Sequence, residues 1–212
     1  MNTDFEFRQL MRAYRSGLIS EATFESEMAK LEGKAGANGH GFKAFGKTYK
    51  CERDAVVSFL DKVRAGEAGG GEAFAAWAAV CTTDCIRSGL RMVSERESYH
   101  SRIFEQRLLE LGGEKRAGQT EQGRKFRDTL ADPSIPDNEK LLMFTRVVGE
   151  PKDAVKPIQE FIALIKEDEQ TKEALKLFCE DEFSTATWLW NACAALNAPA
   201  KPANAEAARA TA

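Results

Sequence analysis

Apolar side chains recur every three or four positions over most of this chain. From about residue 54 to residue 197 this spacing is typical of the buried face of an amphipathic helix. No segment combines strand-like alternation with turn residues at its ends. The pattern therefore predicts an all-α protein. We expect long helical stretches over residues 54–81, 84–111, 138–165 and 169–196, and a crossover, 114–136, with a short helix near 124–130.

Glycines and prolines interrupt two of these stretches. The glycines at 69–71 each weaken the first by up to about 1 kcal/mol relative to alanine, so either one bent helix or a break is expected. Pro151 and Pro157 interrupt the third. Two hairpins of long helices joined by one long crossover describe an antiparallel four-helix bundle over residues 54–197.

A separate unit precedes this bundle. Residues 1–32 predict a short helical hairpin, because Gly17 can end a first helix and Ser20 can cap a second. Residues 33–53 are glycine-rich, contain His40 and predict a linker, and residues 198–212 predict a disordered tail. The run RQLMRAYRSGLISEATFESEMAKLEGK (8–34) resembles the SHOCT motif, which implies an accessory role through a protein partner or a homo-oligomer. An unrelated two-helix hairpin is the alternative.

Composition excludes several classes of protein. The formal net charge of the 212 residues is −3, which gives no reason to expect a nucleic-acid partner. No run of about 18 apolar residues is present, so we expect no membrane partner. The first ten residues contain acids and lack the apolar core of a signal peptide. Five cysteines, an odd number without the spacing of a disulfide scaffold, favour reduced thiols and a cytoplasmic location.

The chemistry of the chain centres on Glu97 and His100. They lie three residues apart and so share one face of a helix, where a carboxylate and an imidazole can bind the same metal ion. His40 and His100 are the two histidines in the chain, so a site that uses imidazole must use one of them. ExxH alone is common by chance, and its surroundings decide its meaning.

The two halves of the predicted bundle resemble one another. The segment that ends at Gly66-Glu67 parallels the one that ends at Gly149-Glu150, and Glu97-x-x-His100 parallels Glu182-x-x-Thr185. In an antiparallel hairpin, residues equally far from the turn lie at one level. Counting back from the turns pairs Glu97 with Glu67 and Glu182 with Glu150.

This arrangement resembles the ferritin-like (rubrerythrin-type) superfamily over about residues 54–196. The resemblance implies a four-helix bundle with a two-iron or two-manganese site in its core, and an Asp181 that could orient an imidazole. The candidate ligands are Glu67, Glu97, His100, Glu150 and Glu182. Thr185 stands where the family pattern has a second histidine, and a neutral hydroxyl is a poor iron ligand. Glu72 and Glu160 are rival ligands if the glycines or prolines shift the level of the site.

Two functions remain open from the sequence. The first is a protein that binds one or two Fe or Mn ions and, if it is an enzyme, oxidises Fe(II) or reduces O₂ or peroxide. The second is an interaction or structural protein that kept the bundle and lost the metal, as Thr185 suggests. In that case the glutamates form a salt-bridge network with neighbouring arginines or face the solvent.

Overall fold

The computed structural model describes residues 3–36 and 41–198, and within them the fold is mostly helical, as the hydrophobic spacing predicts. The N-terminal hairpin consists of α1 (Thr3–Arg15) and α2 (Glu21–Gly36). Gly17 has a φ of +70° in the turn between them, and the Ser20 hydroxyl accepts a hydrogen bond from the Thr23 N–H at 3.2 Å. The expected linker residue His40 and the expected tail beyond residue 198 lie outside the described residues.

The segment predicted as a linker contains a small β-hairpin. Strands β1 (Phe42–Ala44) and β2 (Lys47–Tyr49) pair antiparallel, with Phe42 opposite Tyr49. The turn between them has positive φ at Phe45 and Gly46, as the tightest hairpin turns require. The Phe45 ring stacks on Phe59 at 5.3 Å between centroids, which helps to offset the strain of a positive φ at a phenylalanine. The expectation that this region lacks strands was therefore wrong.

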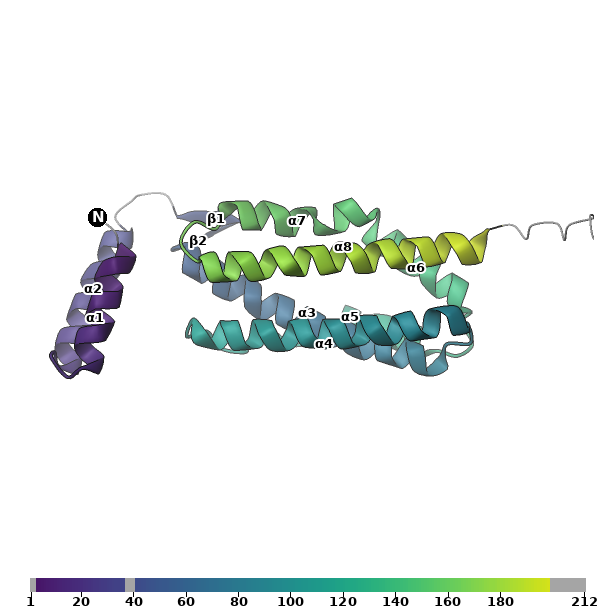
Figure 1. Cartoon of the computed structure of the whole chain (residues 1–212), viewed down its shortest axis with the longest axis horizontal. Coiled ribbons are helices and arrows are strands. Elements are labelled where there is room, and N and C mark those ends of the chain that lie inside the picture. Colours follow the sequence, from purple (N-terminus) through teal and green to yellow (C-terminus); the bar gives the residue numbers. More distant parts are fainter. Residues whose placement is uncertain (1–2, 37–40, 199–212) are drawn as a thin grey trace, which may run out of the picture.

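The helical body, by which we mean Glu52–Asn197, contains the remaining helices. These are α3 (Glu52–Val80), α4 (Asp84–Glu110), α5 (Glu121–Ala131), α6 (Asp137–Val148), α7 (Pro151–Leu164) and α8 (Glu169–Asn197). In Figure 1, α7 and α8 lie in the upper part of this body and α3, α4 and α5 in the lower part. Helix α3 runs unbroken through the three glycines. None of the helices within the described ranges combines the length and apolar character that crossing a bilayer requires.

The third expected stretch is two helices rather than one kinked helix. Helix α6 ends at Val148, Gly149 takes a φ of +74°, and Pro151 opens α7. A glycine with positive φ ends a helix, and a proline lacks the N–H that a continuing helix would need. Pro157 lies inside α7, which continues past it.

Two carboxylates at opposite ends of the body tie its halves together. The Glu52 carboxylate, at the start of α3, accepts hydrogen bonds from the backbone N–H groups of residues 166–168 at 2.7–3.0 Å. The Asp137 carboxylate, at the start of α6, accepts them from the N–H groups of residues 82 and 83 at 3.0 and 2.9 Å. Glu52 and Asp137 are 85 residues apart, as are Glu97 and Glu182. The resemblance between the halves therefore extends to their contacts.

Two apolar clusters fill the interior and leave a polar layer between them. One cluster contains Leu60, Phe104 and Phe178, and the other contains Phe74, Val93 and Leu189. Helices α3, α4 and α8 each contribute residues to both clusters. On each helix, a buried or half-buried acidic residue lies between the residues of one cluster and those of the other. These are Glu67, Glu97 and Glu182. Ionisable side chains from three helices thus lie together in the interior.

Candidate metal centre

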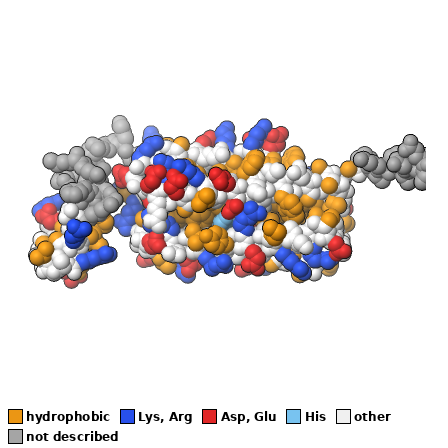
Figure 2. Space-filling model, in the orientation of Figure 1, with side chains coloured by type: hydrophobic (Ala, Val, Ile, Leu, Met, Phe, Trp, Pro, Cys, Tyr) orange, Lys and Arg blue, Asp and Glu red, His pale blue; other side chains and the backbone are white. Residues whose placement is uncertain are grey.

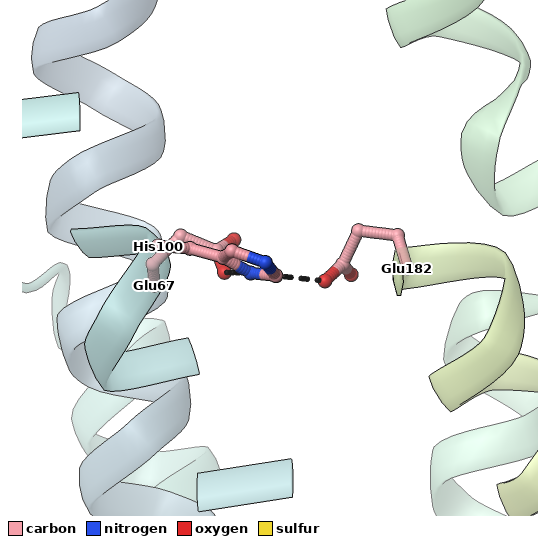
Figure 3. Close-up of side chains that lie close together, drawn as sticks. All are labelled: Glu67, His100 and Glu182. Atoms are coloured by element: carbon pink, nitrogen blue, oxygen red, sulfur yellow. Dashed lines mark hydrogen bonds and ion pairs between the residues drawn. The ribbon is translucent and has the colours of Figure 1, made fainter. Parts of the chain in front are cut away.

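Three side chains from three helices meet in the polar layer. Glu67 of α3, His100 of α4 and Glu182 of α8 each offer one ligand atom, and these atoms all lie within 4.8 Å of one another (Figure 3). The Nδ1 atom of His100 is 3.3 Å from Oε2 of Glu67 and 3.8 Å from Oε1 of Glu182. Glu67 and His100 are buried, and Glu182 is half-buried. The structure thus brings together three of the five residues that the sequence indicated as ligands.

Glu97 lies beside this group and is buried as well. It is one helical turn from His100 on α4, as the ExxH spacing requires. Its carboxyl group interacts with that of Glu67, whose charge raises the pKa of Glu97. Two neighbouring buried carboxylates repel each other, which favours a proton on one of them when no cation is present.

The glycines of α3 make room for Glu97 and for α4. A Cβ atom at Gly70 would lie 2.7 Å from Oε2 of Glu97, and one at Gly71 would lie 2.6 Å from Oγ of Ser98. The Ser94 hydroxyl donates a hydrogen bond to the carbonyl oxygen of Gly71 at 2.8 Å, which holds the two helices at this close distance. The sequence indicated only that these glycines weaken the helix. A glycine run inside a helical pattern was nevertheless a signal of close packing.

Asp181 orients the imidazole of His100. Nε2 of His100 is 3.0 Å from Oδ2 of Asp181, as the candidate role of Asp181 requires. Since a carboxylate can only accept, Nε2 carries the hydrogen and Nδ1 is left to face Glu67 and Glu182. The Arg96 guanidinium in turn donates to Oδ1 of Asp181 at 3.4 Å, and the edge of the His100 ring packs on Phe178 at 4.9 Å between centroids.

The electrostatics of the site favour neutral carboxyl groups. Burial, and then repulsion from Glu182, raises the pKa of Glu67 to about 8. Burial, and then the charge of Glu67, raises the pKa of Glu97 to about 9. Burial, and then the charge of Glu97, raises the pKa of Glu182 to about 8, although His100 and Arg96 act in the opposite direction. A cation bound here would oppose all three shifts, because its positive charge favours the ionised carboxylates.

The donors present fit one metal ion. Oε1 of Glu182 is buried and has no hydrogen-bond partner among the described residues, so this oxygen is free to bind a cation. Arg96, the nearby cation, bonds to Asp181 rather than to the three ligand candidates. The site reaches the surface, because a quarter of the Glu182 side chain and 45% of the Asp181 side chain are exposed. Figure 2 shows a small area of histidine surface among hydrophobic and acidic side chains on this face.

Glu150 does not join the site. It precedes Pro151 at the break between α6 and α7, its side chain is 57% exposed, and it forms an ion pair with Lys152 at 2.9 Å. Counting back from the predicted turn placed Glu150 level with Glu182, but this prediction assumed that one continuous helix precedes the turn. The break at Gly149 turns the side chain to the solvent. The rival ligands Glu72 and Glu160 are exposed as well.

The second half of the repeat lacks the donors for a second ion. An offset of 85 residues relates Glu67 to Lys152, Glu97 to Glu182 and His100 to Thr185. A lysine and a threonine therefore take the places of a glutamate and a histidine. Among the described residues, the first half brings both glutamates and an imidazole to the polar layer, whereas the second half brings Glu182 and no imidazole. The second half therefore offers fewer candidate ligands than the first.

No protein-family model, curated protein or solved structure matches this chain. The functional conclusion therefore depends on the geometry and chemistry of the polar layer.

Proposed function

We propose that the helical body binds one divalent transition-metal ion through Glu67, His100 and Glu182. The observation that carries this proposal is the convergence of their ligand atoms, within 4.8 Å, from three different helices in the interior. These three residues, with the carboxyl group of Glu97 beside them, give a cation enough donors, and solvent can complete its coordination from the exposed edge. The ferritin-like resemblance of the sequence is in accord with such a site.

Charge gives the physical reason for a cation here. Several carboxylates that are buried together without a partner would cost several kcal/mol each or would have to take up protons. A divalent ion offsets their repulsion and releases those protons on binding. Glu67 and Glu182 would hold the charge, and Asp181 would keep Nδ1 of His100 directed at the ion.

Iron or manganese fits the donors best. Carboxylate oxygens with a single imidazole are hard ligands, which suit Fe²⁺ or Mn²⁺ better than Zn²⁺ or Cu⁺. When bound, such an ion supplies one-electron chemistry, as in the oxidation of Fe(II) or the reduction of O₂ or peroxide. All five cysteines are free. We propose a cytoplasmic location, because a reducing compartment keeps thiols in that state.

The test is the metal content of purified protein after dialysis against Fe²⁺ or Mn²⁺. We expect about one ion per chain in the wild type, and an affinity at least about tenfold weaker in Glu67→Gln and His100→Ala, since each removes a ligand. Glu150→Gln is the matched control, because it makes the same change at an exposed glutamate outside the site. Equal metal content in all four proteins would contradict the proposed site.

The competing proposal is a metal-free helical interaction protein. Thr185 and the exposed Glu150 favour it, because they leave Glu182 as the one ligand candidate of the second half that lies in the site. The raised pKa values of Glu67 and Glu97 allow the cluster to exist in a protonated form without a cation. A wild type that binds neither ion but unfolds cooperatively would support this second function.

We also propose that the α1–α2 hairpin binds a second copy of the chain. None of its side chains that the structure describes is buried, although Tyr14 stacks on Phe24 at 4.6 Å between centroids. Two short helices without a buried core are marginal in water. Basic residues in the last turn of α1 and an acidic residue in the first turn of α2 could pair between copies.

A further inference from the structure

The Thr185 hydroxyl is buried and has no hydrogen-bond partner. The residue is 4% exposed, and its Oγ1 atom contacts no donor or acceptor among the residues that the structure describes. A threonine in a helix usually bonds back to the carbonyl one turn earlier, but this one does not. Leaving a buried hydroxyl unpaired is unfavourable and is rare in native proteins. The hydroxyl is therefore available to a partner that comes from outside the chain.

The position of Thr185 relates it to the metal centre. It lies three residues after Glu182 on α8, so the two side chains share one face of the helix. Oε1 of Glu182 also lacks a partner, which leaves two unpaired oxygens at neighbouring positions on this face. The repeat makes Thr185 the equivalent of His100, whose longer side chain reaches the ligand atoms of the site. The shorter threonine therefore offers a hydroxyl at the place where the first half has an imidazole ligand.

We propose that Thr185 binds a small oxygen-bearing or anionic ligand of the metal ion. This inference rests on the proposed metal site. A small anion bound to the ion would take this hydroxyl as its hydrogen-bond partner. The hydroxyl can donate one hydrogen bond and accept another, while the ion attracts the negative charge of the ligand. The surrounding carboxylates oppose an anion, so its affinity will be modest.

Azide binding to the Co²⁺-loaded protein tests this role. Cobalt binds carboxylate and imidazole sites at least as well as Fe²⁺ or Mn²⁺, and its visible absorption reports a new ligand. Thr185→Val removes the hydroxyl and keeps the shape, so we expect azide affinity about five- to tenfold weaker with unchanged Co²⁺ stoichiometry. Thr185→Ser keeps a hydroxyl, so its azide affinity should be close to that of the wild type. Thr187→Val is the matched control, because its Oγ1 is also buried and unpaired but lies on a different face of α8.

The possible outcomes separate this inference from the proposed function. If Co²⁺ binds and azide binds equally well to the wild type and Thr185→Val, the role of Thr185 is wrong and the metal site stands. If the wild type binds no Co²⁺, both proposals fail. Thermal unfolding of the metal-free proteins gives a further readout. An unpaired hydroxyl predicts an equal or higher midpoint for Thr185→Val, and a midpoint several degrees lower would show that the hydroxyl is bonded within the fold.

Discussion

Gly70 has a specific role in the site although it binds nothing. Its missing side chain leaves the space that the Glu97 carboxyl group occupies, only 2.7 Å from where a Cβ atom would be. Since the carbon would touch the end of a side chain, the cost of a substitution falls on Glu97 rather than on the backbone of α4. We therefore expect Gly70→Ala to displace Glu97 and to destabilise the protein by about 1–3 kcal/mol, as overpacking does.

Gly66→Ala is the matched control for this prediction. Gly66 lies one turn earlier on α3, and a Cβ atom there would meet nothing within 4 Å. This variant should be more stable than the wild type by up to about 1 kcal/mol, because alanine favours the helix. Urea unfolding of both variants measures the difference. A Gly70→Ala protein as stable as Gly66→Ala would show that Glu97 does not depend on this space.

At the scale of elements, the α1–α2 hairpin is the part that lacks a core of its own. If the hairpin associates with a second copy, an apolar side chain on the hairpin surface becomes buried in the contact and stabilises the association. Phe7 is 38% exposed on α1. We expect Phe7→Glu to weaken self-association of the full chain about tenfold or more, because burial of a phenylalanine contributes about 1.5–3 kcal/mol.

Sedimentation velocity over a range of concentrations measures this association. The control is Gln9→Glu, which adds the same charge at an exposed polar position of α1. It should associate like the wild type. A wild type that remains monomeric at all concentrations would rule out self-association through the hairpin.

For the whole molecule, the polar layer makes stability depend on pH. Without a cation, the carboxyl group of Glu67 has a pKa of about 8 in the folded protein and an ordinary value, near 4.5, when unfolded. Between these values the folded state holds more protons than the unfolded state, so the free energy of unfolding falls as pH rises. We expect the metal-free protein to lose on the order of a few kcal/mol between pH 5 and pH 8.

Denaturant unfolding at several pH values tests this dependence. Glu67→Gln should reduce the slope, because glutamine does not titrate. Saturating Fe²⁺ or Mn²⁺ should oppose the loss, since the metal binds the ionised carboxylates and binds more tightly at higher pH. An unfolding free energy that is constant from pH 5 to pH 8 would show that these carboxyl groups reach the solvent.

Local sequence determined where most helices lie and which residue types could hold a metal. Helical spacing gave the positions of α3, α4, α5 and α8 closely, since each helix has a stripe of apolar residues that only burial explains. It did not reveal β1 and β2, because three-residue strands show no clear alternation and Phe45 is an unusual residue at a positive φ. The ExxH spacing likewise fixed that Glu97 and His100 share a face.

Tertiary structure decided which candidates meet. Whether a glutamate faces the interior depends on the continuity of its helix and on the distance to the next one, and spacing along the chain contains neither. The break at Gly149 turned Glu150 to the solvent, whereas Gly70 and Gly71 brought α3 and α4 close enough for Glu67 to reach His100. The sequence thus specified the helices and their chemistry, and the packing between helices selected Glu67, His100 and Glu182 as the site.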